Sequence, residues 1–588
     1  MRTSALLLLC SVALLRAQDY SLGPDSQPRE GVPKGVVTRL KLDPGKYYPG
    51  TPHNYAIYVP AQYDPSKPAP YMVFLDGSGP LGNAQRVPTV FDNLIAKGDL
   101  PPLIGIFVDP GVLPALNDAA QSRFERVFEY DSLSDRFSRF LLEELIPEVA
   151  KKYNLSKSPD DHAISGVSTG AVGAFAAAWN RPDQFHRVLS FIGTFVAMKG
   201  ADGLPALIRK TEPKPIRIFL QEGKNDHVVP SEPYGTFYAG SWPINNQVML
   251  EAFQSAGYDV KLEMGEEGHN MKQGAAIMPE ALRWLWRGYP SPIVAKEPAD
   301  FEKPGWDPRG KVYSIVSSAK GWEQVGATYG AVSNPAGDKD GNVYFADAGA
   351  NRIYRSDAAG KVTVFKDGAR GVRALRVGPD GRIYAALPGR IVSYGPGGDE
   401  KVLTQDVDAT DLAITAKGDV YYSDPVHRKL GMVDTKGEPR TVYARSEIAI
   451  PHGLALSPDQ AMLVVSDAQG RFSWSFQIAA NGALINGEPF YRLEMPESGW
   501  MSEVTGVTLD SIGQVYFATP LGVQMCEANG RTAAILNPPE HGAISALAFA
   551  GKDHDWLYVA EGGKLFRRPV KVKGVPAWAP AKLPRPPL

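Results

Sequence analysis

The feature that most constrains the fold of this chain is a short motif that recurs six times in its second half. Each copy is a run of apolar and aromatic residues typical of a β-strand, and it follows a turn that contains Gly or Asp. The copies recur roughly every 40 residues, which is the period of a four-stranded propeller blade, and six blades close a ring. They lie at 343–347, 383–386, 420–424, 463–467, 515–519 and 557–560. The sequence therefore predicts an all-β, six-bladed propeller over residues 312–575.

The first half of the chain has a different pattern, in which short apolar runs alternate with helical periodicity. The runs 71–75, 104–108 and 188–192 are largely apolar, which favours strands buried on both faces, as in a parallel sheet. Apolar residues also recur every four positions from Leu133 to Leu145, a stripe typical of a helix that packs on such a sheet. Residues 20–290 are therefore predicted to form an α/β domain, a mostly parallel sheet with helices on both faces.

Length and charge fit this division into two domains. A chain of 588 residues is long enough for two large cores, and the Pro-rich stretch 291–311 is predicted to link them. The 62 basic and 64 acidic residues leave a formal net charge of -2. Such a balance does not suggest a polyanionic partner, so no nucleic acid is expected to bind.

The N-terminus has the pattern of a secretory signal peptide. Met1 and Arg2 precede an apolar stretch, 5–15, and Ala17 supplies the small residue that a cleavage site requires. The stretch is shorter than the roughly 20 residues that span a bilayer, so we expect cleavage of residues 1–17 and no membrane anchor afterwards. Removal of Cys10 leaves Cys526 as the single cysteine, which precludes an intramolecular disulfide. We expect an exported bacterial protein, periplasmic or secreted.

The segment 166–170 matches the pattern G-x-S-x-G. It lies between a strand-like run, 162–164, and a helix-like stretch of small residues, 171–179. This is the setting of a nucleophile elbow, a strained turn that exposes a serine between a strand and a helix. Ser168 is therefore the candidate nucleophile.

Two further residues complete a candidate catalytic triad. Asp226 follows the strand-like run 216–220, and His269 follows a later one, 260–264. In a parallel sheet such residues gather at the carboxyl ends of the strands. A serine hydroxyl needs a neutral imidazole to remove its proton, and a carboxylate fixes the imidazole tautomer. Glu222 remains an alternative acid, and His227 an alternative base.

The tetrahedral intermediate of such a reaction also needs hydrogen-bond donors for its oxyanion. The backbone N–H of Thr169, which directly follows the nucleophile, is one candidate. The second is expected from the loop after the strand 71–75, where Gly77 and Ser78 remain alternatives. Trp242 is a candidate to line an aromatic substrate pocket, although packing in the core is its alternative role.

These motifs lead to a family resemblance over about residues 54–290. The segment resembles the esterase-D-like group of α/β-hydrolases, which includes enterochelin, feruloyl and acetyl-xylan esterases. The resemblance implies Ser168, Asp226 and His269 as the triad, in agreement with the choice made from the residues. It rests on 74–77, 126–131, 140–147, 166–170, 221–223, Asp226, 268–269 and 279–286.

The second half resembles the six-bladed propellers of the gluconolactonase and regucalcin type, with 451–459 as the best local match. In that family a Glu, two Asn and an Asp hold a divalent metal in the central channel. The matching positions here are Ser333 or Asn334, Thr410, His452 and Thr505. A hard cation prefers several carboxylate or carbonyl oxygens, so this set is a poor cage. No metal and no other cofactor are therefore expected.

Three functions fit these patterns. The first is an exported serine carboxylesterase that hydrolyses a siderophore-type ester or a feruloyl or acetyl sugar ester. Its propeller would bind substrate or a partner, or cover the active site. The second is a metal-dependent lactonase or sugar-ester hydrolase centred on the propeller. The third is a binding protein that has lost its esterase activity. The intact triad residues favour the first, with a small-molecule or carbohydrate ester as substrate.

Overall fold

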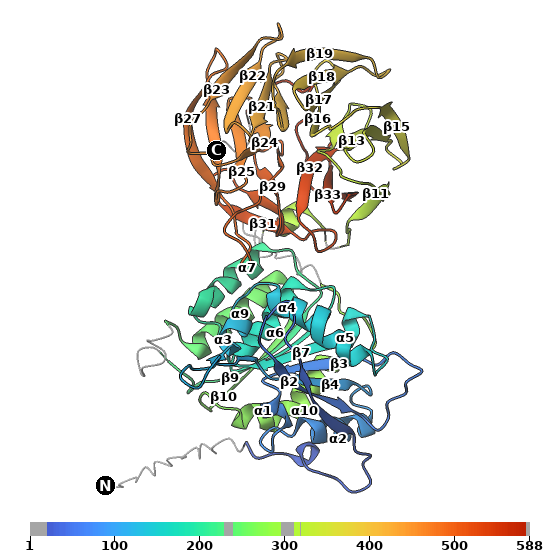
Figure 1. The fold of residues 1–588 in the computed structure, drawn as a ribbon, viewed down its shortest axis with the longest axis vertical. Helices are drawn as coiled ribbons and strands as arrows, with labels where there is room; N and C mark the ends of the chain where they lie inside the picture. Colours follow the sequence, from blue (N-terminus) through green and yellow to red (C-terminus); the bar gives the residue numbers. More distant parts are fainter. Residues whose placement is uncertain (1–19, 229–238, 296–310, 318, 584–588) are drawn as a thin grey trace, which may run out of the picture.

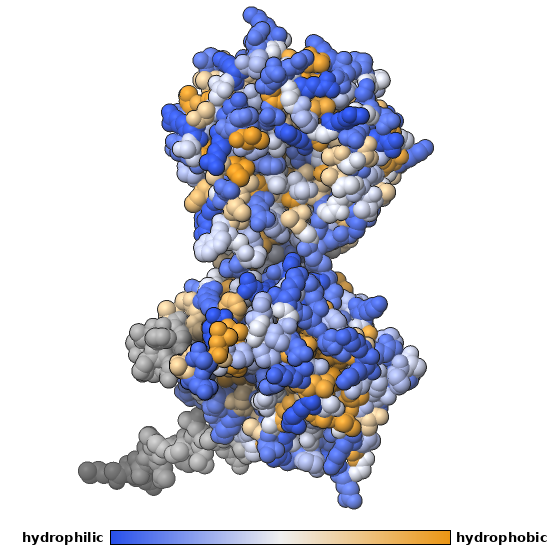
Figure 2. All heavy atoms as spheres, in the orientation of Figure 1, coloured by the Kyte–Doolittle hydropathy of each residue, from blue (hydrophilic) through white to orange (hydrophobic). Residues whose placement is uncertain are grey.

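The computed structural model describes residues 20–228, 239–295, 311–317 and 319–583. It contains two lobes, an α/β lobe and a β-propeller, which meet at the waist seen in Figures 1 and 2. The predicted signal peptide lies outside the described residues, as does most of the predicted linker. This arrangement confirms the predicted fold class.

The α/β lobe is built on one eight-stranded sheet in the order β1-β2-β4-β3-β7-β8-β9-β10. The pairs β1–β2 and β2–β4 are antiparallel, and the other pairs are parallel. The strands are β1 (Val36–Leu42), β2 (His53–Val59), β3 (Tyr71–Leu75), β4 (Ile104–Val108), β7 (His162–Val167), β8 (Arg187–Phe191), β9 (Arg217–Gly223) and β10 (Asp259–Gly265).

Helices cover both faces of this sheet. One face packs on α2 (Val87–Lys97) and α10 (Lys272–Trp286). The other packs on α6 (Thr169–Asn180), α7 (Leu204–Lys210), α9 (Trp242–Ala256) and the helical segment 136–150. Short elements complete the lobe: η1 (Pro24–Ser26), α1 (Ser78–Leu81), β5 (Val112–Leu113), β6 (Arg123–Phe124), α3 (Arg126–Tyr130), η3 (Pro159–Asp161) and η4 (Met198–Gly203).

The helix predicted from the apolar stripe differs in its bounds. It begins at Arg136, because Leu133 has a φ of 53° that a helix does not allow. It continues as α4 (Arg136–Phe140), a π-helical turn (Leu141–Leu145) and α5 (Ile146–Ala150). Pro147 lies at the start of α5, directly after the π-helical turn. Phe137, Leu141 and Leu145 are buried, as the stripe predicts.

The second lobe consists of six four-stranded sheets. The six repeated runs are the second strands of their blades, which confirms the predicted propeller. The first five blades are β12 (Ala336–Gly337) to β15 (Val362–Asp367), β16 (Ala374–Val377) to β19 (Glu400–Gln405), β20 (Asp411–Ile414) to β23 (Pro439–Tyr443), β24 (Pro451–Leu456) to β27 (Leu484–Arg492), and β28 (Val507–Leu509) to β31 (Thr532–Leu536).

The strands that lie inside these five blades are β13 (Val343–Asp347), β14 (Arg352–Ser356), β17 (Ile383–Leu387), β18 (Arg390–Tyr394), β21 (Val420–Asp424), β22 (Lys429–Val433), β25 (Met462–Asp467), β26 (Phe472–Ile478), β29 (Val515–Thr519) and β30 (Gly522–Cys526).

The sixth blade closes the ring with strands from both ends of the propeller sequence. It combines β32 (Ile544–Ala550), β33 (Trp556–Glu561) and β34 (Lys564–Pro569) with β11 (Glu323–Thr328). Because β11 pairs antiparallel with β34, the outer edge of this blade is supplied by the start of the domain. Such pairing removes two free strand edges and holds the circle shut.

The two lobes contact each other at the segment between α7 and β9, next to the waist in Figure 1. Thr211 forms a parallel bridge with Ile535 of β31, and the N–H of Glu212 donates to the carbonyl of Ile535 at 2.8 Å. The Glu212 carboxylate accepts hydrogen bonds from Arg568 at 2.9 Å and from the N–H of Asn537 at 3.1 Å. The propeller therefore docks beside the amino-terminal end of β9.

We predict that Glu212→Ala destabilises this junction strongly. The Arg568 side chain is 3% exposed, so loss of Glu212 would leave a buried charge without its carboxylate, at a cost of about 3–5 kcal/mol. The matched control is Glu494→Ala, which removes a more exposed pair with Lys210 worth about 0–1 kcal/mol. Calorimetry should show a clearly larger fall in melting temperature for Glu212→Ala. Equal shifts in the two variants would contradict the prediction.

Candidate active site

The turn around Ser168 has the geometry of a nucleophile elbow. Ser168 joins β7 to α6 with φ 58° and ψ -122°, a backbone conformation that costs of order 1–3 kcal/mol for a residue with a side chain. A Cβ on Gly166 would lie 2.0 Å from the carbonyl oxygen of Gly170, so only glycine permits this close turn. The strained turn presents the serine hydroxyl at the carboxyl edge of the sheet.

The structure brings the three predicted triad residues together. Asp226 follows β9 and His269 follows β10, and the two strands are parallel neighbours. The Nε2 atom of His269 lies 2.9 Å from the Oγ atom of Ser168. The Nδ1 atom lies 2.9 Å from each carboxylate oxygen of Asp226. Asp226 is buried, whereas the side chain of His269 is 24% exposed.

Glu222, the alternative acid, lies behind Asp226. Its carboxyl group is buried and accepts hydrogen bonds from the N–H of Gly223 at 2.8 Å and from Nδ2 of Asn246 at 2.6 Å. Burial raises its pKa well above the ordinary range, and the negative charge of Asp226 raises it further. Both effects favour the protonated form of Glu222 beside Asp226.

His227, the alternative base, stacks on His269. The two imidazole centroids lie 4.8 Å apart with an angle of 27° between the ring planes. The backbone N–H of His227 donates to Oδ1 of Asp226 at 2.6 Å. The ring of His269 contacts both Ser168 and Asp226 through hydrogen bonds.

One polar neighbour of the nucleophile was missed by sequence reasoning. The Oγ1 atom of Thr194 lies 3.0 Å from the Oγ atom of Ser168. Thr194 is 1% exposed and follows β8, which lies beside β7 in the sheet. The rule that catalytic groups follow parallel strands applies to it as well. Threonine after a strand is nevertheless too common in proteins to be singled out from the sequence.

Trp242 lies beside this group of residues. Its indole is 2% exposed, and Nε1–H donates to Oγ1 of Thr194 at 3.2 Å. Its ring meets the rings of His227 and His269 edge to face, at centroid distances of 5.1 and 5.7 Å. The buried indole therefore contacts Thr194, His227 and His269.

The two candidate second oxyanion donors are engaged within the protein. The N–H of Gly77 donates to the carbonyl of Val108 at 3.0 Å, and the N–H of Ser78 donates to Oδ1 of Asp109 at 2.8 Å. The N–H of Thr169 opens α6, where the first N–H groups of a helix have no intrahelical acceptor. Thr169 thus remains a candidate for the first donor, whereas both alternatives for the second donor already donate within the protein.

Arg126 ties the loop after β3 to the elbow. Its guanidinium forms two hydrogen bonds of 2.7 Å with the Asp76 carboxylate and one of 3.0 Å with the carbonyl of Val167. It also donates to the hydroxyl of Thr169. Both charged side chains are about one quarter exposed, so this bidentate pair is partly shielded from water. It fixes the loop that carries Gly77 and Ser78 relative to Ser168.

The propeller channel does not fit the divalent metal of the gluconolactonase and regucalcin type that it resembles. Asp411 offers a buried carboxylate there, but Arg376 contacts it at 2.7 Å and Asn334 donates to it at 3.1 Å. Among the matching positions, His452 contacts the carbonyl of Thr505 at 2.9 Å through Nδ1. The guanidinium of Arg376 supplies the positive charge that a metal ion would supply.

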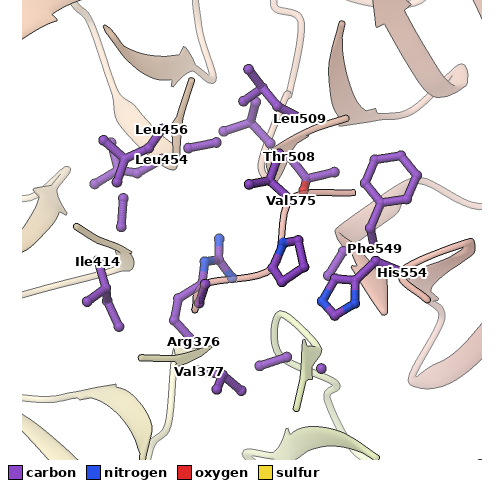
Figure 3. Close-up of a pocket in the computed structure, with 18 of the residues that line it drawn as sticks. Arg376, Val377, Ile414, Leu454, Leu456, Thr508, Leu509, Phe549, His554 and Val575 are labelled. Atoms are coloured by element: carbon purple, nitrogen blue, oxygen red, sulfur yellow. The ribbon is translucent and has the colours of Figure 1, made fainter. Parts of the chain in front are cut away.

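Apolar side chains line the channel around Arg376. The cavity there has a volume of about 170 Å³. Its wall includes Ile414, Leu454 and Phe549 (Figure 3). The segment that contains Val575, beyond the last propeller strand, forms part of the same wall. Such a lining offers few oxygen ligands to a hard cation.

Among the described residues, no helix combines the length and the apolar character that crossing a membrane requires.

Comparisons with known proteins match the two lobes separately. Residues 48–280 match the family described as "Putative esterase", and residues 329–562 match the "SMP-30/Gluconolactonase/LRE-like region". The chain is 26% identical over 208 residues to an iron(III) enterobactin esterase of Dickeya dadantii. This alignment covers 33% of this chain and 42% of that protein. It is also 23% identical over 230 residues to a gluconolactonase of Zymomonas mobilis, in an alignment that covers 35% of this chain and 64% of that protein.

Each of these curated relatives is thus matched over less than two thirds of its own length. Among solved structures, a gluconolactonase from Xanthomonas campestris aligns with a TM-score of 0.39 at 18% identity, over 44% of this chain and 91% of that one. The enterobactin esterase of Shigella flexneri aligns with a TM-score of 0.34 at 19% identity, over 44% of this chain and 62% of that one. The first lobe is thus similar to the esterase family over residues 48–280, and the second to gluconolactonase-like propellers over residues 329–562.

Proposed function

We propose that the protein is an exported serine carboxylesterase that uses Ser168, His269 and Asp226. The observation that carries the proposal is the continuous hydrogen-bonded path from Ser168 Oγ through His269 to the buried Asp226, with distances of 2.9 Å. The esterase-family match over residues 48–280 supports the same chemistry. Export rests on the signal-peptide pattern of residues 1–17.

In the proposed reaction, His269 Nε2 takes the proton of Ser168 as Oγ attacks the ester carbonyl carbon. Asp226 holds the proton on Nδ1 and stabilises the imidazolium that forms. His269 then gives its proton to the leaving alcohol, and an acyl-enzyme remains on Ser168. Water, activated by the same imidazole, releases the acid. The N–H of Thr169 is placed to donate to the oxyanion.

The hydrogen bonds around Ser168 have one consistent direction. The Nδ1 atom of His269 faces two carboxylate oxygens, so it carries the proton and Nε2 accepts from the serine hydroxyl. An indole N–H can only donate, so Trp242 donates to Thr194. The hydroxyl of Thr194 then donates to Ser168. We propose Thr194 as a positioning residue that leaves the serine proton aimed at His269.

The names of the relatives narrow the substrates that we propose. One relative is called an iron(III) enterobactin esterase and one solved structure a ferulic acid esterase. We therefore propose a catecholate siderophore ester or a feruloyl or acetyl sugar ester as substrate. The propeller would bind the substrate or a partner. A metal-dependent lactonase centred on the propeller finds no support in the ion pair of Arg376 and Asp411.

The proposal predicts that Ser168→Ala abolishes ester hydrolysis. The test compares wild type and variant on p-nitrophenyl acetate, methyl ferulate and a catecholate siderophore lactone, each with and without EDTA. Loss of a triad nucleophile costs a factor on the order of 10⁶ in kcat, so the variant should fall to background. EDTA should have no effect. Hydrolysis that survives Ser168→Ala and stops with EDTA would move the chemistry to the propeller.

Thr194→Val tests the positioning role. Valine has a similar shape but no hydroxyl, so Ser168 Oγ loses a donor. We expect kcat to fall about tenfold, which is about 1.4 kcal/mol, with little change in KM. Thr194→Ser keeps the hydroxyl and should retain most of the activity. If Thr194 only filled space, the valine variant should be the more active of the two, because serine lacks the methyl group. A Val variant with the kcat of the wild type would contradict the proposed role.

Glu222→Gln tests the raised pKa of Glu222. The raised pKa of Glu222 means that the folded state binds the proton of this carboxyl group more tightly than the unfolded state. Its contribution to the free energy of unfolding is thus complete below the ordinary pKa of about 4.3 and decreases as pH rises through the folded-state value. We expect wild type to lose more stability than Glu222→Gln between about pH 5 and about pH 9. Denaturant unfolding at both pH values measures this difference, and identical losses would contradict it.

A further inference from the structure

Three side chains at the active site come together in a way that ester hydrolysis does not require. One ligand atom each from Asp226, His227 and His269 lies within 4.8 Å of the other two. Asp226 is buried, and both imidazoles are partly exposed, so the group is accessible from one side. Asp226 and His269 belong to the proposed triad, whereas His227 has no assigned role in the reaction.

The chemistry of these atoms points to one kind of ligand. Two imidazole nitrogens and one carboxylate oxygen form a set of three ligands that suits Zn²⁺ and leaves a fourth position for water. Calcium and magnesium prefer oxygen ligands and fit this set poorly. The set is of the same kind as the three-residue sites that hold catalytic zinc, but here it overlaps the base of a serine hydrolase.

To accept the ion, the three ligand atoms, which lie within 4.8 Å of one another, must rearrange around it. The Nδ1 atom of His269 and the carboxylate oxygens of Asp226 are 2.9 Å apart. Two ligands at about 2.1 Å on a tetrahedral zinc lie roughly 3.4 Å apart. The His227 ring already stacks nearly parallel on His269, and Trp242 packs edge to face against both rings. The two imidazoles are thus held next to the carboxylate before any ion arrives.

We propose that Asp226, His227 and His269 form a reversible inhibitory zinc site. Zinc would bind Nδ1 of His269 in place of the proton that this atom donates to Asp226. A neutral imidazole keeps one proton in total, so that proton moves through solvent to Nε2. A protonated Nε2 no longer accepts the proton of Ser168, and the nucleophile loses its base. The inhibition rests on the proposed function, but the binding of zinc does not.

His227→Phe tests the site with little other change. Phenylalanine keeps an aromatic ring against His269 and Trp242 but has no nitrogen to offer the metal. Calorimetric titration of the full chain with zinc chloride should show one equivalent bound to wild type and at least about tenfold weaker binding to His227→Phe. Zinc should inhibit ester hydrolysis by wild type, reversibly on addition of EDTA, and should need a correspondingly higher concentration with the variant.

The control is His427→Gln. His427 is 56% exposed and contacts Asp424 at 2.8 Å, an exposed pair of the kind that collects zinc adventitiously. This variant should bind zinc and be inhibited like wild type. The proposal is overturned if His227→Phe binds zinc as tightly as wild type, or if His427→Gln removes the binding. If wild type hydrolyses no ester, the proposed function fails, and the titration still decides whether zinc binds.

Cobalt(II) gives a second measurement that needs no variant. In a tetrahedral site with two imidazoles, cobalt(II) shows intense visible absorption, whereas six-coordinate cobalt(II) on oxygen ligands is nearly colourless. We expect the intense tetrahedral bands with wild type, and zinc should displace them. A six-coordinate spectrum would contradict the proposed ligand set.

Discussion

The arrangement of this active site depends on four parallel strands that end side by side. Ser168, Thr194, Asp226 and His269 each follow one of the consecutive strands β7, β8, β9 and β10. Parallel neighbours end at the same edge, so residues separated by about a hundred positions in sequence come within hydrogen-bond distance. The close approach of Gly166 to Gly170 then allows the serine to project from that edge.

Much of this organisation could be predicted from the sequence, and for physical reasons. A repeat of about 40 residues implies a blade, because each blade must bury its faces against its neighbours. The elbow has a fixed spacing because its glycines must touch, and the order Ser, Asp, His follows from the strand order. Such features are local in sequence or are forced by topology.

Other features depend on contacts that no local pattern encodes. The contact of Thr194 with Ser168 depends on the pairing of β8 with β7, which the sequence around Thr194 does not indicate. The N–H groups of Gly77 and Ser78 bond to Val108, the last residue of β4, and to Asp109, which follows it. The helix that runs past Pro147 contains a π-helical turn, which the apolar stripe could not indicate. The docking of Glu212 against Arg568 joins residues 356 positions apart, and neither has a signature of its own.

The closure of the propeller has a consequence for biosynthesis. The blade that seals the ring needs β11, made early, and β34, made near the end of the chain. The α/β lobe can pack its core as soon as residues up to β10 and α10 have emerged. The ring has no complete sixth blade until about 240 residues beyond β11 have been added. During that interval the exposed strand edges are open to pairing with other chains, and a chaperone that shields them would have the most effect at this stage.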